Sequence, residues 1–167
     1  KPELANEFTA LDSLASSGNM DYSTLNKELA KLAGIPVEQA IVELRAHQKN
    51  EELLAFISEL KKDYKIGFLS NVATDILGSM FDPGDLELFD DIVLSYQVGL
   101  AKPDEKIFQL TSARLGVESE KCVFVDDNYT YLYGAEMLGM KTILYKDFTS
   151  FKQELDTIIT DTNSNPK

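Results

Sequence analysis

Three short groups of polar residues in this sequence each follow an apolar segment or stand in a loop just after one. The adjacent carboxylates Asp126 and Asp127 come directly after a run of four apolar residues. Ser70 and Asn71 end another apolar stretch, and Lys102 precedes a proline in a short loop. Carboxylate oxygens are the ligands that Mg²⁺ prefers, hydroxyl and amide groups hydrogen-bond oxygens, and an ammonium group neutralises phosphate charge. Phosphoryl transfer needs these residue types together.

The elements that must position these groups form an alternating pattern. The continuous apolar run at 122–125 predicts a strand buried on both faces, and the largely apolar segments at 64–69, 91–98 and 142–145 predict three more strands. The expected helices cover 76–81, 104–116, a segment ending near 139, and 150–160. Strands alternating with helices predict an α/β fold with a parallel sheet and right-handed crossovers. Because the carboxyl ends of parallel strands share one edge, the polar groups should converge there.

The first third of the chain shows helical periodicity only. Apolar residues recur at helical spacing over 3–15, and Ser23 and Asn50 are expected to cap later helices. Pro36 suits the first turn of a helix between those two. We therefore expect a helical region at 1–49, an α/β core at 50–160 and a polar, frayed tail at 161–167.

Each polar group also has a purely structural explanation. An acid after a strand often caps the next helix, so Asp126 and Asp127 fit a cap as well as a ligand set. Ser70 and Asn71 fit a turn, and Lys102 fits a surface loop. Only the arrangement of all three groups favours a function.

Composition excludes several classes of protein. The chain has 28 acidic residues against 16 Lys and Arg, a net charge of −12, which argues against non-specific binding to nucleic acid or anionic membranes. A bound cation can reverse the local field, so a phosphate substrate stays open. The single histidine, His47, excludes a His-based triad, and the single cysteine, Cys122, excludes an internal disulfide. With no signal peptide and no apolar run of about 18 residues, we expect a soluble, cytoplasmic protein.

The polar groups and their neighbours resemble the motifs of the haloacid dehalogenase-like (HAD) hydrolases. The segments similar to motifs two, three and four, in the family's order, are Leu-Ser-Asn at 69–71, Gly-Leu-Ala-Lys-Pro-Asp at 99–104 with Ile-Phe at 107–108, and Val-Phe-Val-Asp-Asp at 123–127. Gly-Ala at 134–135 and Leu-Gly-Met at 138–140 match the helix after motif four. The resemblance covers about residues 50–160, and the preceding helices are similar to the family's small helical cap.

This resemblance implies a Rossmann-like core and a Mg²⁺-dependent phosphatase that acts on a small phosphorylated metabolite. By the resemblance, Ser70 would bind the transferring phosphoryl group with Asn71 beside it. Lys102 would stabilise the charge of the nucleophile and the phosphate. Asp126 would coordinate Mg²⁺, with Asp127 supporting the metal site. Dehalogenases of the same family dispense with Mg²⁺, so the intact acid pair argues against that activity.

The sequence departs from the family's pattern at two places. Tyr131 stands where many relatives carry a small polar residue. The family's first motif, Asp-x-Asp after an apolar strand, supplies the nucleophile and the general acid/base, and it is absent. Asp12 and Asp21 do not follow an apolar strand, so neither is assigned as nucleophile. In the family that strand lies between those of motifs two and four, so its absence would leave two central strand edges unpaired.

Three explanations for the missing motif stay open. The chain is a truncated product, which we favour, or a second polypeptide supplies the strand, or the sheet has closed its gap and lost catalysis. We expect the 167-residue chain alone to show little or no turnover. The alternative function is a non-catalytic module that binds a metal, a phosphate or a protein. A receiver-like phosphoacceptor is set aside because its acid pair comes early in the chain, whereas here it comes last.

Overall fold

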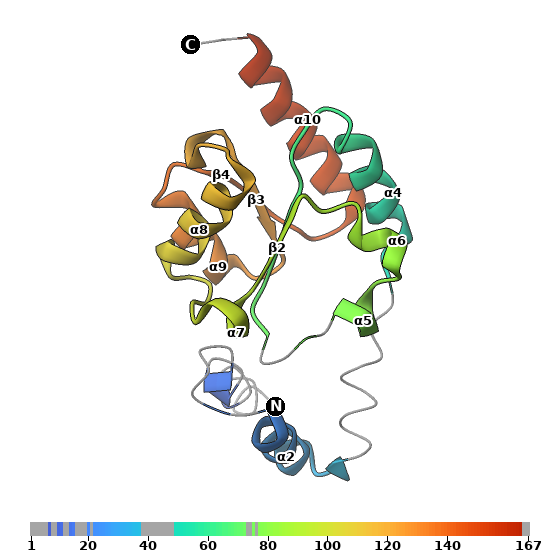
Figure 1. Cartoon of the computed structure of the whole chain (residues 1–167), viewed down its shortest axis with the longest axis vertical. Coiled ribbons are helices and arrows are strands. Elements are labelled where there is room, and N and C mark those ends of the chain that lie inside the picture. The colour runs from blue at the N-terminus through green and yellow to red at the C-terminus, as the bar shows by residue number, and fades with distance from the viewer. Residues whose placement is uncertain are drawn as a thin grey trace.

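A computed structural model describes residues 7, 10, 11, 14, 15, 20, 22–37, 49–72, 75 and 77–164 of the chain. From residue 51 onward, strands and helices alternate, as Figure 1 shows. The helices are α2 (Tyr22–Ala33), α4 (Glu51–Leu60), α5 (Leu77–Met80), α6 (Pro83–Leu86), α7 (Ser95–Val98), α8 (Glu105–Leu115), η1 (Ser119–Lys121), α9 (Tyr129–Glu136) and α10 (Phe148–Ser164). The strands are β1 (Gly67–Ser70), β2 (Asp91–Leu94), β3 (Val123–Asp126) and β4 (Lys141–Leu144).

The described strands form two separate parallel pairs. β1 pairs with β2, with Leu69 opposite Val93, and β3 pairs with β4, with Val125 opposite Ile143. Within the described residues, no ladder joins one pair to the other. The parallel α/β architecture confirms the predicted fold class. The single closed sheet of the third explanation is not the arrangement seen among these strands.

The strands differ from prediction in their bounds or in their burial. β1 begins at Gly67 rather than at residue 64. The segment predicted as one strand over 91–98 is β2 followed by the short helix α7, which ends at Gly99 with a φ of 67°. This left-handed conformation favours glycine. β3 is half-buried along its whole length rather than buried on both faces. Because no described strand flanks its second edge, β3 lacks the cover that a central strand would have.

The helix ends follow capping chemistry, with some shifts from prediction. Asn50 caps α4 as predicted, because its side chain accepts the Leu53 N–H at 3.0 Å. α2 already begins at Tyr22, so Ser23 lies within its first turn rather than at its cap. α10 begins after Asp147, not at Ser150, and continues to residue 164, so the first residues of the predicted tail are helical. The helices predicted over 3–15 and after Pro36 lie for the most part outside the described residues.

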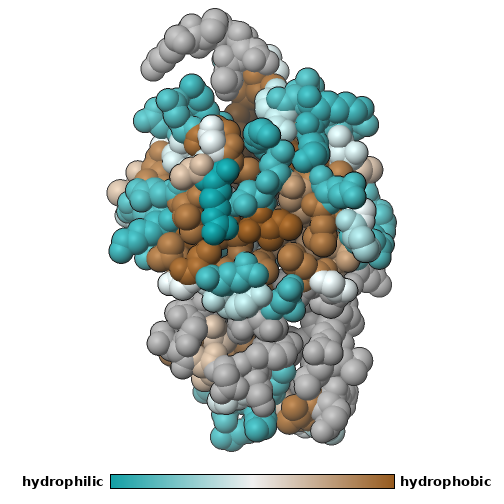
Figure 2. Space-filling view, in the orientation of Figure 1, coloured by the Kyte–Doolittle hydropathy of each residue, from teal (hydrophilic) through white to brown (hydrophobic). Residues whose placement is uncertain are grey.

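Apolar packing holds the two strand pairs in one body. One cluster combines Val93 of β2, Phe108 of α8 and Ala135 of α9, with Leu69 of β1 and Phe124 of β3 packed against it. Burying each large side chain contributes about 1.5–3 kcal/mol. Figure 2 shows apolar surface across the middle of the face seen in Figure 1. The helices therefore link the strand pairs although no ladder does.

A second cluster fixes α4 and α10 on the β3–β4 side. It is built on Ile143, Phe151 and Leu155, with Leu53 and Phe56 of α4 packed against it. The helices of the first third have a small core of their own, made by Ala15, Leu25 and Leu29 with partly buried neighbours. In the part of the chain that the structure describes, no helix is both long and apolar enough to span a membrane.

Candidate active site

Two of the predicted site residues stand at strand ends. Ser70 is the last residue of β1, and Asp126 is the last residue of β3. Lys102 lies in the loop before α8, whose first turn is capped by the Asp104 side chain. The structure thus brings residues from three distant parts of the sequence to one edge of the fold.

Lys102 connects the two strand pairs at this edge. Its Nζ donates to Asp126 Oδ2 at 2.6 Å, and both side chains are only 8% exposed. The same Nζ lies 3.4 Å from the carbonyl oxygen of Leu69, the residue before Ser70. Charge-assisted hydrogen bonds of this length are strong, and buried charges require such partners. Lys102 therefore spans from β3 to β1 at the ends of the two strands that have no ladder between them.

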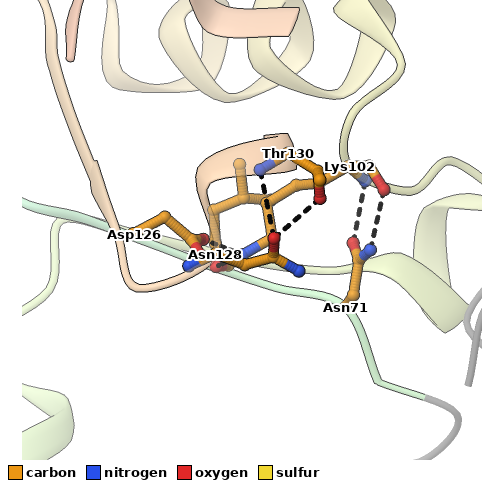
Figure 3. A network of polar contacts seen from close by, with 6 residues as sticks. Asn71, Lys102, Asp126, Asn128 and Thr130 are labelled. Carbon is orange, nitrogen blue, oxygen red and sulfur yellow. Dashed lines mark hydrogen bonds and ion pairs between the residues drawn. The ribbon is translucent and has the colours of Figure 1, made fainter. Parts of the chain in front are cut away.

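Asn71 holds the Lys102 loop by its backbone. Its Oδ1 accepts the Lys102 N–H at 2.8 Å, and its Nδ2 donates to the Lys102 carbonyl at 2.9 Å (Figure 3). The amide group of one side chain thus satisfies both backbone groups of the lysine. Asn71 positions Lys102 relative to the end of β1.

Asp126 is held from the other side by the start of α9. Its Oδ1 accepts the Asn128 N–H at 2.8 Å, and Asn128 Oδ1 in turn accepts from the Thr130 N–H and hydroxyl group (Figure 3). Both Asp126 oxygens therefore carry a hydrogen bond, but each retains a lone pair. Asp127 is exposed, so the two predicted metal ligands differ in their surroundings.

The donor set suits Mg²⁺ in type but is small. Carboxylate oxygens are hard ligands, and Mg²⁺ usually keeps several waters beside one or two carboxylates. Asp126 and Asp127 would supply such oxygens. Among the residues that the structure describes, no group of three His, Cys, Asp or Glu side chains gathers. The metal would rely on water and on oxygens from outside the described residues.

Two residues that support the site were not predicted to do so. A Cβ on Gly134 would lie 2.0 Å from the Pro103 carbonyl oxygen, so only glycine lets α9 approach the Lys102 loop this closely. Ser95 is fully buried, and its hydroxyl accepts the Val72 N–H at 2.8 Å and donates to the Val72 carbonyl. For Gly134, the signal available in the sequence was a glycine inside a helical pattern. Nothing in the sequence pattern singled out Ser95.

Cys122 and His47 do not enter this site. Cys122 is half-buried, and burial raises the pKa of its thiol, which disfavours the nucleophilic thiolate. Cys122 packs against the cluster of Val93, Phe108 and Ala135 instead. His47 lies outside the described residues.

Comparison with known proteins identifies the family. The profile of the haloacid dehalogenase-like hydrolases matches residues 4–139. The chain belongs to this family of hydrolases.

The relatives at the sequence level include phosphatases and longer proteins. The chain is 31% identical over 157 residues to rat bifunctional epoxide hydrolase 2, covering 83% of this chain and 27% of that protein. It is 29% identical over 143 residues to mouse acyl-CoA dehydrogenase family member 10, covering 83% of this chain and 13% of that protein. It is 24% identical over 160 residues to D-ribitol-5-phosphate phosphatase of Bacteroides thetaiotaomicron, covering 85% of this chain and 74% of that protein. The chain thus spans less than a third of the first two of these relatives.

Solved structures share the fold. A HAD family enzyme from Bacteroides thetaiotaomicron, solved as a magnesium complex, superposes with a TM-score of 0.67 at 20% identity, covering 84% of this chain and 77% of that one. A HAD-like family hydrolase from Porphyromonas gingivalis gives a TM-score of 0.64 at 25% identity, covering 87% and 78%. These likenesses agree with the Rossmann-like architecture.

Proposed function

We propose that this chain carries the phosphate- and metal-binding part of a Mg²⁺-dependent phosphatase that acts on a small phosphorylated metabolite. The observation that supports this most is the ion pair of 2.6 Å between Lys102 Nζ and Asp126 Oδ2 at the edge where Ser70 ends β1. The buried cation at this edge can attract a phosphate, and the buried anion beside it can bind the metal that accompanies the phosphate. Relatives named as phosphatases agree with this class of reaction.

Each residue has a role that its surroundings support. Ser70, half-buried at the end of β1, would hydrogen-bond a phosphoryl oxygen. Lys102 would neutralise phosphate charge while Asn71 keeps its backbone in place. Asp126 would hold Mg²⁺, with the exposed Asp127 near the metal and its waters. When bound, Mg²⁺ would supply the positive charge that a transferring phosphoryl group requires.

The nucleophile in this proposal is a carboxylate on a strand outside the described residues. That strand would lie between β1 and β3, each of which has one edge without a ladder partner among the described residues. Backbone groups at such edges favour pairing with an added strand. A segment preceding residue 1 or a second polypeptide would supply it. Its carboxyl end would then bring an aspartate beside Lys102 and Asp126.

The direct test supplies the strand. The chain is extended at its N-terminus by an apolar strand that ends in Asp-x-Asp, and hydrolysis of a generic aryl phosphate is followed with Mg²⁺. We expect activity that EDTA and Asp126→Ala abolish, while the unextended chain shows little or none. The matched control carries Asn-x-Asn in the same extension and should be inactive. Activity that survives both EDTA and Asp126→Ala would contradict the metal assignment.

A non-catalytic binding module is the second candidate. It is favoured by the small acid set, because no three metal-ligating side chains gather among the described residues. Such a module would bind Mg²⁺ or phosphate but give no turnover even when the strand is supplied. The extended chain with its Asn-x-Asn control separates these two functions.

A further inference from the structure

The ammonium group of Lys102 lies between two aromatic rings. Its Nζ is 4.9 Å from the centroid of the Tyr131 ring on α9 and 5.7 Å from the centroid of the Phe124 ring on β3. On its remaining sides it contacts the Asp126 carboxylate and the Leu69 carbonyl oxygen. The positive charge is thus enclosed by two ring faces and two oxygens.

Such an enclosure stabilises the position of a lysine side chain in a specific way. The negative face of an aromatic ring attracts a cation, and the attraction grows when the cation is withdrawn from water. The Lys102 side chain is 8% exposed, which meets this condition. A ring carries no net charge, so it holds the ammonium without competing with a phosphate for it. Lysine otherwise has a flexible stem whose ordering is costly.

Tyr131 differs from the other tyrosines of α9. Tyr129 and Tyr133 are 73% and 64% exposed, whereas Tyr131 is half-buried and faces Lys102. The first turn of α9, which bears Tyr131, is fixed by the Asn128 cap that also binds Asp126. The helix is close enough because Gly134 presents no side chain to the Lys102 loop. The local structure therefore places this ring, and not its neighbours, on the ammonium.

We propose that Tyr131 is a positioning residue that holds the Lys102 ammonium on Asp126 before metal and phosphate bind. Its contribution to catalysis rests on the function proposed above. The contact itself is a property of the chain alone. The two can therefore be tested separately.

The contact is tested by NMR on the full chain labelled with ¹⁵N-lysine. Lys102→Arg, which keeps the positive charge, identifies the Lys102 ammonium resonance, which in the wild type should be shifted upfield by the ring and protected from exchange. Tyr131→Phe keeps the ring and should keep both properties, whereas Tyr131→Leu should reduce both, with the Phe124 ring and the two oxygen contacts still in place. Tyr133→Leu on the same helix is the matched control and should leave the resonance unchanged. A Lys102 resonance that is insensitive to Tyr131→Leu would overturn the proposal.

A double-mutant cycle measures the strength of the contact. Tyr131→Leu and Lys102→Met are compared singly and together by urea unfolding. The two positions should be coupled by about 2- to 30-fold in the unfolding equilibrium constant, as expected for a partly to fully desolvated pair. When Tyr131→Phe replaces Tyr131→Leu in the cycle, the coupling factor should be close to 1, because the ring is kept. The absence of coupling in the leucine cycle would contradict the contact, and the NMR comparison still decides if Lys102→Met does not fold.

Titration with inorganic phosphate in the presence of Mg²⁺ links the contact to function. If the wild type binds phosphate, Tyr131→Leu should weaken binding by about 2- to 30-fold, with Tyr131→Phe and Tyr133→Leu close to wild type. An unchanged affinity in Tyr131→Leu would overturn the positioning role. If the wild type does not bind phosphate, the proposed function loses support, and the NMR and coupling results alone decide whether Tyr131 positions Lys102.

Discussion

The contacts within the two strand pairs of this protein differ in kind from the contacts that join the pairs at the candidate site. The β3–β4 pair packs on α10 and α4 through Ile143 and Phe151, and Asp126 stands at the carboxyl end of β3. The β1–β2 pair is covered by a cluster in which Phe68 contacts Phe81 and Phe89. Each pair is thus stabilised by its own apolar contacts.

Between the pairs, the contacts at the carboxyl edge are polar. Lys102 reaches Asp126 on one pair and the Leu69 carbonyl on the other. Apolar packing assembles the body, but a buried ion pair connects the halves where a ligand would bind. A change at this edge should therefore affect stability and ligand binding together, whereas a change elsewhere should affect stability alone.

The largest effect is expected from breaking the ion pair. Lys102→Met leaves the Asp126 carboxylate buried without its cation and should lower the free energy of unfolding by about 3–5 kcal/mol. Adding Asp126→Asn to Lys102→Met removes the unpaired charge and should recover part of that loss. Urea unfolding measures both variants. A loss below about 1 kcal/mol, the size typical of an exposed pair, would show that the pair does not connect the halves.

Crowding the contact between α9 and the Lys102 loop should have the next largest effect. The Cβ of Gly134→Ala would overlap the Pro103 carbonyl oxygen at 2.0 Å, and overpacking of this kind costs about 1–3 kcal/mol or more. Gly84→Ala is the matched control, because nothing lies within 4 Å of its added Cβ. Thermal unfolding should separate the two variants, and equal midpoints would argue against close packing of α9 on this loop.

Removing one asparagine side chain at the site and one away from it should distinguish the site from the rest of the fold. Asn71→Ala deletes both hydrogen bonds to the Lys102 backbone and should cost about 1–3 kcal/mol. Asn50→Ala deletes the cap of α4 and should cost about 1 kcal/mol. The Lys102 ammonium resonance should shift in the first variant and stay in place in the second. A shift in both would mean that the site is not locally organised.

The smallest effect is expected for the loss of stability in acid that comes from Asp90, a carboxylate away from the site. The Ile66 N–H and the nearby Lys65 and Lys61 lower the pKa of Asp90 from its ordinary value of 3.8. A lowered pKa in the folded state means that Asp90 contributes its full stability above the ordinary value. That contribution is lost as the pH falls through the lower folded value. Stability measured from about pH 5 to pH 2 should therefore decline less steeply in Asp90→Asn than in the wild type. Identical slopes would contradict the assignment.

The order of elements and the edge that gathers the polar residues could be predicted from sequence, because hydrophobic periodicity and strand-end placement are local patterns. The helical turn at Ser95–Val98 could not, since its apolar residues continue the pattern of β2 and its conformation depends on a buried serine. The contact of Tyr131 with Lys102 joins separate elements, so no spacing in the sequence encodes it. The separation into two strand pairs was anticipated only through the absent family motif.

The central claim is that a carboxylate outside the described residues attacks a phosphate held by Lys102 and by the Mg²⁺ that Asp126 would bind. It is tested most directly by mapping the phosphorylated residue. The extended chain that carries Asp-x-Asp is incubated with Mg²⁺ and an aryl phosphate, quenched, and analysed by peptide mass mapping. We predict a phosphoaspartate on the supplied strand and none within residues 1–167. A phosphoaspartate within residues 1–167, or none anywhere while phosphate is released, would contradict this account.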